Sequence, residues 1–325
     1  MTENNKNDLK TSNINNVLRS FIGQREFSVT IIFIVMLVAL IFTAPNFLAF
    51  ETFRSFLLAF SLDALVAIGM LILLIGGMFD LSVGSVLALS GAVMNLFFKT
   101  NPFLAIFLGF FTGVVAGVIN GLLVSRVGIN ALIATLATMG IFRSLALIAF
   151  TRVGVYSRLP SPFVKLADFK ILGLEFFIWL MVIIAIIFHI GLSRSRFLRQ
   201  VYYMGGNKES AELAGINTKN LTLISFIISG CLASLAGVLY LIRFRAASVS
   251  IGTNTALDVI TAVIIGGASL FGGRGSVRGA LTGLGLMILI QTGLVFWGVN
   301  PDYQRLIVGS ILVLAVSIDV LTRKR

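Results

Sequence analysis

The sequence has 325 residues, of which 58% are hydrophobic and only 12% are charged, and its mean hydropathy is +1.02. A soluble domain is usually about 45–50% apolar and about 25% charged, so this composition excludes an ordinary soluble protein and predicts an integral membrane protein. The net charge of +12 does not require a nucleic-acid partner, because lysine and arginine in loops set membrane topology. Long unbroken apolar runs, rather than alternation over about ten residues, predict helices and not a β-barrel.

The chain is expected to contain one all-α transmembrane domain, residues 26–321, between a polar arm (1–25) and a basic tail (322–325). The arm carries no cleavage pattern of a removed signal peptide. A span needs about 20 mostly apolar residues. The sequence therefore predicts ten spans, at residues 27–44, 56–76, 82–98, 103–124, 130–150, 175–192, 219–241, 256–271, 277–297 and 304–321.

The distribution of basic residues predicts that both termini are cytoplasmic. With ten spans the two termini share one side of the membrane, and the segments on that side hold 15 of the 25 lysines and arginines. Basic residues favour cytoplasmic segments, so this modest excess indicates the orientation.

The first interruption of the apolar pattern is the segment 76–85, between the second and third spans. In hydrocarbon an unpaired backbone amide or a carboxylate costs several kcal/mol, so such a segment must lie inside protein or beside a watery cavity. We expect Asp80, Ser82, Gly84 and Ser85 to shape a pathway or gate. A short inter-helix turn, with Asp80 and Ser82 capping the next helix, is the alternative.

The fourth span contains glycines at intervals of four residues: Gly109, Gly113, Gly117 and Gly121. This spacing places them on one helix face, where small residues let two backbones approach closely. The pattern predicts helix packing rather than a ligand site.

Residues 193–218 form the longest polar stretch on the expected cytoplasmic side. Asn207 can cap a short helix there, Glu209 favours its positive end and Gly215 can end it. Ser210, Ala211 and Ala214 would share a small-residue face with Asn207. A flat helix of this kind suits docking into a partner's groove, and an amphipathic surface loop is the alternative.

A second glycine-rich segment, 265–276, follows the eighth span, which is short and is expected to be broken or re-entrant. Five glycines in ten residues exclude a stable straight helix, since each costs about 1 kcal/mol relative to alanine. Both glycine-rich segments have paired glycines followed by a Gly-Ser pair. Such pairs of interrupted segments can mark inverted repeats, but their positions do not match two halves of five spans.

Several kinds of chemistry have no sequence support. There is no phosphate-binding Gly-x-x-x-x-Gly-Lys-Ser/Thr motif, no Gly-x-Ser-x-Gly elbow, and only one histidine, His189, which excludes a His-Glu-x-x-His zinc site. We therefore expect neither an enzyme nor a bound metal or cofactor. Asp63 and Asp80 could serve as proton or ion relays, so a secondary transporter is a competing class.

The chain resembles the ribose-type sugar permeases of bacterial ABC importers. The likeness rests on segments 77–85, 205–216 and 265–275, supported by 130–136 at the start of the fifth span and 232–237 in the seventh. It covers residues 25–321 in the family's order. Branched-chain amino-acid permeases belong to the same broad superfamily. The sequence Asp-Leu-Ser-Val-Gly at residues 80–84 resembles that of the sugar permeases within it.

The resemblance implies an inner-membrane permease subunit that works with a second permease, expected to be an identical copy, two cytoplasmic ATPases and an extracytoplasmic sugar-binding protein. ATP would be used by the partner, and a monosaccharide, ribose or another pentose, would be the cargo; a nucleoside or autoinducer is the alternative. The implied pathway adds Asn130, Thr135, Gly266, Gly267, Ser269, Gly272 and Gly273. The implied ATPase-coupling segment comprises Gly205, Gly206, Asn207, Glu209, Ala211, Ala214, Gly215 and Ile216.

Overall fold

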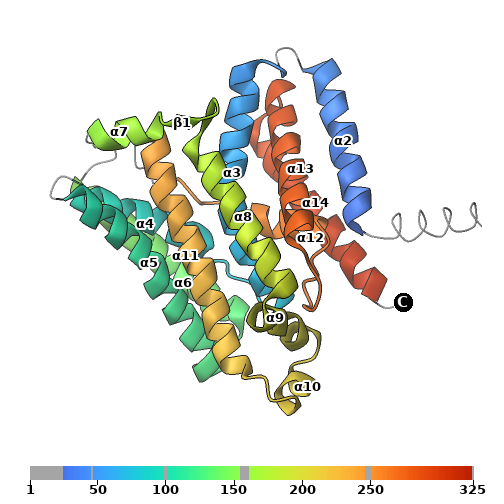
Figure 1. Cartoon of the computed structure of the whole chain (residues 1–325). Coiled ribbons are helices and arrows are strands. Elements are labelled where there is room, and N and C mark those ends of the chain that lie inside the picture. The colour runs from blue at the N-terminus through green and yellow to red at the C-terminus, as the bar shows by residue number, and fades with distance from the viewer. Residues whose placement is uncertain (1–24, 45–46, 99–100, 154–160, 246–249, 324–325) are drawn as a thin grey trace, which may run out of the picture.

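The computed structural model describes residues 25–44, 47–98, 101–153, 161–245 and 250–323, so most of the expected polar arm and the end of the basic tail lie outside it. In this part the chain is a bundle of helices with one two-stranded hairpin (Figure 1). The elements are α2 (Arg25–Thr43), α3 (Phe50–Ile75), α4 (Val83–Phe97), α5 (Pro102–Leu122), η1 (Leu123–Val127), α6 (Ala131–Val153), α7 (Ser161–Ala167), β1 (Lys170–Ile171), β2 (Leu174–Glu175), α8 (Phe176–Arg194), α9 (Arg196–Gly206), α10 (Lys208–Leu213), α11 (Thr218–Phe244), α12 (Thr255–Ile265), α13 (Val277–Phe296) and α14 (Pro301–Arg323).

The expected all-α, polytopic membrane architecture is confirmed. Within the described residues, 7 helices are long and apolar enough to cross a membrane, and α2, α4 and α12 contribute shorter apolar stretches. A helix overlaps each of the ten predicted spans. The predicted end of the eighth span at residue 271 is wrong, because α12 ends at Ile265, where paired glycines turn the chain.

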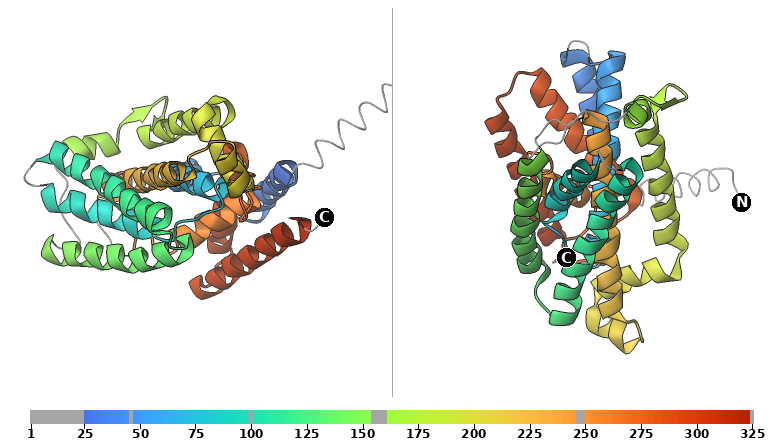
Figure 2. Two further views of the ribbon diagram at one scale, coloured as in Figure 1. Left: turned by 90° about the horizontal axis from the view of Figure 1, so that it is seen from below. Right: turned by 90° about the vertical axis from the view of Figure 1, so that its left-hand side faces the viewer.

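The centre of the bundle is α3, which packs against α8, α9, α11, α12 and α13. Every residue of its second half, from Ala64 to Ile75, is buried. A helix that is apolar on all faces is expected in such a position. At the other extreme is α14, which lies at the edge of the bundle (Figure 2) and has only 6% of its apolar window buried, against 83% for α3.

Two helices start inside the bundle instead of at its ends. At 1.5 Å per residue, α4 is about 22 Å long and α12 about 17 Å, both short of the roughly 30 Å hydrocarbon core. The residues at their starts meet: a Cβ atom added to Gly84 would lie 2.0 Å from the carbonyl oxygen of Gly252. The loop before α12 is therefore in contact with the first expected broken segment (76–85), and a Cβ atom on Gly77 would lie 3.5 Å from the Phe271 carbonyl oxygen of the second (265–276).

The two glycine-rich turns have the same backbone structure. After α3, the Gly76, Gly77 and Met78 amides donate to carbonyls of the last helical turn, and after α12 the Gly266, Gly267 and Ala268 amides do the same. The second glycine of each pair has a positive φ, 74° at Gly77 and 97° at Gly267, which glycine adopts without steric cost. The paired glycines thus end both helices in the same way.

The stretch 193–218 is more ordered than the sequence predicts. Instead of a loop with one short helix it contains α9 and α10, which project together at one end of the bundle (Figure 1). The buried residues of α9 are Val201 and Met204. Leu198 and Tyr202 are partly buried beside them, and this spacing of three or four residues between arginines is an amphipathic helical pattern that could have predicted α9 from the sequence.

Candidate functional site

The first broken segment, residues 76–82 (the hinge), is organised around the buried carboxylate of Asp80. Its Oδ1 accepts hydrogen bonds from the Ser82 backbone amide at 2.7 Å and from the Ser82 hydroxyl at 2.6 Å. The Asn120 side chain, on α5, donates to Oδ2 at 3.3 Å and to the Ser82 hydroxyl at 2.8 Å. Ser82 makes no side-chain cap bond to α4. Simple helix capping therefore does not account for this pair of residues.

The hinge is also tied to α6. The Thr138 hydroxyl donates to the Asn120 side-chain oxygen at 2.7 Å, and the Leu81 amide donates to the Thr135 hydroxyl oxygen at 3.2 Å. All of these polar groups are buried or partly buried, where an unsatisfied group is costly. The network therefore holds hinge, α5 and α6 together, and the expected pathway residue Thr135 belongs to it.

Asn130, another expected pathway residue, lies elsewhere. It is exposed at the start of α6, where its side chain accepts a hydrogen bond from the Leu132 amide at 2.9 Å. It thus caps a helix and does not join the buried network. Ser85 lies one turn into α4, and its buried hydroxyl has no hydrogen-bond partner within the described part of the chain.

The loop that precedes α12 is fixed from two sides. Gly252 lies against Gly84 of α4, and the neighbouring Ile251 carbonyl accepts a hydrogen bond from Arg143 of α6 at 2.8 Å. Arg143 is partly buried, and this bond satisfies part of the hydrogen-bonding capacity of its charged guanidinium group. The start of α12 is consequently held against α4, which follows the hinge, and against α6, which also holds the hinge.

Three segments meet at the end of the bundle that carries α9 and α10, and we call this contact the glycine joint (Ile75, Gly205, Gly272, Gly273). The carbonyl of Ile75, the last residue of α3, accepts a hydrogen bond from the Gly273 amide at 2.7 Å. A Cβ atom on Gly205 would lie 1.8 Å from that same carbonyl oxygen. Only glycine allows this approach. The joint thus brings the expected pathway residues 272 and 273 against the expected coupling residue 205.

The loop between α12 and α13, residues 266–276 (the glycine loop), is also tied to α14. The Asp319 carboxylate accepts hydrogen bonds from the Ser269 hydroxyl at 3.0 Å and from the Leu270 amide at 3.2 Å. Asp319 is 4% exposed. It lies in the tenth predicted span but is not among the expected site residues. A lone acid near the end of an apolar run is the signal that could have identified it.

The short helix α10 has the predicted caps. The Asn207 side chain accepts a hydrogen bond from the Ser210 amide at 2.9 Å, and the chain turns at Gly215, whose φ is 82°. The expected small-residue face is not wholly presented outward, because Ala211 is buried against the protein. Leu213, by contrast, is 90% exposed. The outward surface therefore has an apolar tip.

The four glycines of α5 face two neighbouring helices. A Cβ on Gly113 would lie 2.1 Å from the Gly230 carbonyl oxygen of α11, and one on Gly117 would lie 2.6 Å from the Phe226 oxygen. Gly121 also faces α11, while Gly109 faces both α4 and α11. The regular spacing therefore corresponds to close backbone packing.

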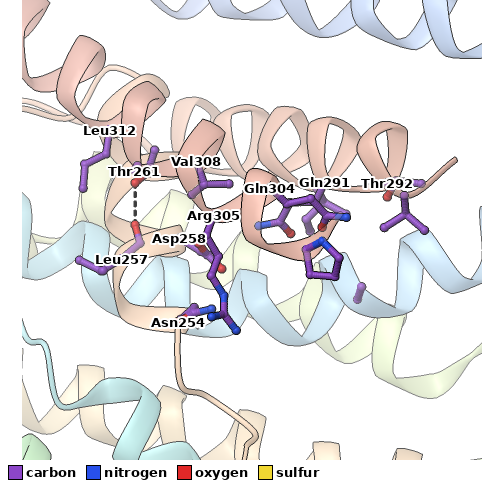
Figure 3. Close-up of a pocket in the computed structure, with 15 residues that line it drawn as sticks. Asn254, Leu257, Asp258, Thr261, Gln291, Thr292, Gln304, Arg305, Val308 and Leu312 are labelled. Carbon is purple, nitrogen blue, oxygen red and sulfur yellow. Dashed lines mark hydrogen bonds between the residues drawn. The ribbon is translucent and has the colours of Figure 1, made fainter. Parts of the chain in front are cut away.

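A cavity of about 640 Å³, which we call the polar pocket, lies between α12, α13 and α14 (Figure 3). About half of its lining residues are apolar, and none of its lining residues is aromatic. The polar lining residues that matter here are Asn254, Asp258, Gln291, Thr292, Gln304 and Arg305. This volume is in the usual range for small-molecule sites, and so is the mixture of apolar walls with a few polar groups.

The fold and these contacts define the class of protein: a polytopic membrane permease. Broken helices that meet inside a bundle, beside buried polar groups, are the usual construction of a transport pathway. The chain belongs to the family described as "Branched-chain amino acid transport system / permease component", whose model matches residues 52–316. It is thus a transport subunit and not an enzyme.

Several relatives match over most of their length. The ribose import permease protein RbsC of Escherichia coli (strain K12) is 32% identical over 300 residues, covering 89% of this chain and 92% of its own. The Bacillus subtilis (strain 168) protein of the same name is 36% identical over 283 residues, covering 85% of this chain and 86% of its own. The L-arabinose transport system permease protein AraH of E. coli is 36% identical, with 90% of each covered. No solved structure matches the chain significantly.

Proposed function

We propose that this chain is the membrane-spanning subunit of an ATP-driven ABC importer for a monosaccharide, ribose or another pentose. The observation that carries the proposal is the 32–36% identity, over at least 85% of the chain, to permeases named for ribose and L-arabinose. The family description names branched-chain amino acids, but the individual relatives named here are sugar permeases. The sugar assignment is therefore the better supported.

ATP hydrolysis is assigned to a partner, since the sequence has no phosphate-binding loop. The proposed docking segment is 205–216, which includes α10. Its exposed Leu213 supplies an apolar contact, and Glu209 and Glu212 add charge beside it. This end of the bundle is then cytoplasmic, and the opposite end receives sugar from an extracytoplasmic binding protein. Ten spans, with both termini cytoplasmic, complete the proposed topology, and the complex would contain two copies of this permease.

The glycine joint gives a route by which motion of the ATPase would reach the pathway. Gly205 is on α9, directly before α10, and it contacts the last carbonyl of α3 and the glycine loop after α12. Close-packed backbone transmits displacement because it cannot be compressed. A shift of α10 would therefore move the ends of both α3 and α12, which lead into the broken segments. In this scheme Asp80, Ser82 and Gly84 shape the gate.

The test is uptake of radiolabelled ribose into proteoliposomes that contain the permease alone or with its cognate ATPase and binding protein. Uptake only by the complete set, and only with ATP, is the expected result. Uptake by the permease alone, driven by an ion gradient, would overturn the proposal in favour of a secondary transporter. Transport of another solute, but no sugar, by the complete ATP-dependent set would reject the sugar assignment and keep the importer class.

A further inference from the structure

The polar pocket is placed where a solute would first enter this permease from outside. Its α13 residues, 288–295, belong to the second half of that helix, and its α14 residues, 301–312, belong to the first half. The glycine joint and α10 are at the other end of the bundle (Figure 1). If α10 docks on a cytoplasmic ATPase, the pocket therefore lies in the outer half of the membrane. This orientation rests on the proposed function.

The polar groups of the pocket come from opposite walls and turn toward each other. Asp258 projects from α12, and Gln291, on α13, is within hydrogen-bonding reach of its carboxylate. From α14, the Arg305 side chain extends toward Asp258 and Asn254 (Figure 3). The Asn254 side chain makes no cap bond to α12. These carboxylate, amide and guanidinium groups have more donors and acceptors than the surrounding contacts use.

Polar groups at this depth are costly unless they face water or a polar solute. A sugar hydroxyl is both a donor and an acceptor. A carboxylate can accept from two adjacent hydroxyls, and a guanidinium can donate to two. Aliphatic walls and the absence of aromatic lining residues limit the affinity, and a transport site must release its solute easily. The pocket thus has the composition of a weak site for a polyhydroxylated molecule.

The two walls of the pocket differ in how firmly they are held. The α12 wall follows directly from the loop fixed by Gly84 and Arg143. The α14 wall packs mainly on α12, and most of its other residues are not buried by the rest of the bundle. Near its far end, α14 is bound through Asp319 to the glycine loop. A rigid wall facing a loosely packed one, itself linked to the glycine joint, can open or close around a solute.

We propose that the polar pocket is the outer sugar-binding site of the permease, in which Asp258 and Gln291 on the fixed wall and Arg305 on the α14 wall bind the hydroxyls of a pentose. The site supplements the delivery of sugar by the binding protein. It deepens the proposed function and depends on it.

The test uses the complete complex and three variants: Asp258→Asn and Gln291→Leu, which keep the size of the native side chain, and Arg305→Gln, which removes the guanidinium group. The control is Asp302→Asn, which changes a carboxylate on α14 outside the pocket lining. We expect initial ribose uptake to fall at least about tenfold in the three variants, because the sugar hydroxyls then lose hydrogen-bond partners in the pocket. Uptake by the control should equal that of the unaltered complex.

Two readouts separate sugar binding from a merely structural role. ATPase co-purification should be retained by the pocket variants, and the uptake ratio of ribose to 2-deoxyribose should change, since one hydroxyl differs between them. Wild-type uptake with an unchanged ratio in all three variants would overturn the pocket assignment alone. An unaltered complete complex that moves no sugar would overturn the proposed function and this site with it.

A labelling experiment covers the case in which a variant fails to assemble. In a Cys231→Ala background, which removes the single native cysteine, Thr292→Cys places a thiol in the pocket and Ser310→Cys places one on α14 outside the lining. Millimolar ribose should slow thiosulfonate labelling at position 292 and not at position 310. Equal labelling rates at 292 with and without ribose, in a complex that imports ribose, would reject the proposal.

Discussion

The carboxylate of Asp319, near the end of α14, accepts a hydrogen bond from the hydroxyl of Ser269, in the glycine loop that follows α12, at 3.0 Å. The same carboxylate accepts one from the Leu270 amide. This contact joins α14, the least buried of the seven long apolar helices, to a loop that also contacts α3 and α9. It is the connection through which the glycine joint reaches one wall of the polar pocket.

Removing this acceptor should loosen α14. Hydrogen bonds to charged groups contribute about 1.5–3 kcal/mol, and the donors left in Asp319→Ala would be only partly solvated. We expect a lower unfolding temperature in detergent and slower sugar uptake. The control is Asp302→Ala, at the exposed start of the same helix, which should cost at most about 1 kcal/mol. Equal unfolding temperatures for the two variants would contradict the importance of the Asp319 contact.

Adjacent glycines of α9 should respond differently to alanine. Gly205→Ala puts a methyl group 1.8 Å from the Ile75 oxygen, whereas no atom lies within 4 Å of a Cβ on Gly206. Overpacking typically costs about 1–3 kcal/mol, while alanine within a helix gains up to about 1 kcal/mol over glycine. Gly205→Ala should therefore abolish ATP-dependent uptake at unchanged membrane abundance, and Gly206→Ala should retain it. Wild-type uptake by Gly205→Ala would remove the joint from the transport mechanism.

The buried network at the hinge should depend on Asn120. Asn120→Ala removes the donor to Asp80 and Ser82 and the acceptor for Thr138. Each buried group left unsatisfied costs about 1–3 kcal/mol, so thermal unfolding in detergent should shift markedly downward. Asn101→Ala, which removes only the exposed N-cap of α5, should cost about 1 kcal/mol. A smaller shift for Asn120→Ala than for Asn101→Ala would count against the network.

Packing of α5 on α11 should be sensitive to a single methyl group. A Cβ on Gly113 meets the Gly230 oxygen at 2.1 Å, but one on Gly140 of α6 meets nothing within 4 Å. We expect Gly113→Ala to destabilise the protein by about 1–3 kcal/mol and Gly140→Ala to be neutral or slightly stabilising. The measurement is fluorescence-detected thermal unfolding of both variants. Equal unfolding temperatures would mean that α5 and α11 move apart enough to accommodate the methyl group at little cost.

The exposed tip of α10 should be needed for ATPase binding. Leu213 is 90% exposed, and Leu172, in the hairpin at the opposite end of the bundle, is 86% exposed. Leu213→Arg would put a charge into a proposed apolar contact and should abolish ATPase co-purification. Leu172→Arg makes the same chemical change away from the proposed docking surface and should leave co-purification intact. Normal recovery of the ATPase with Leu213→Arg would mean that the tip is not part of the interface.

The amino-acid sequence by itself determined the class of this protein and most of its helices. Apolar runs of about 20 residues have few alternatives to helix in a bilayer, because each backbone group must be satisfied within the segment. Local chemistry was also readable: Asn207 caps α10, and paired glycines end α3 and α12. Such features depend on neighbours in the chain.

Only the tertiary structure decided which distant residues meet. Asn120 reaches Asp80 across 40 positions, Ser269 reaches Asp319 across 50, and Gly84 touches Gly252. Polar residues within apolar spans are visible in the sequence, but their partners depend on how helices rotate and pack, which hydropathy does not encode. The polar pocket likewise depends on how the helices pack. Its lining comes mainly from three helices, and their apolar residues give no sign in the sequence that they enclose one cavity.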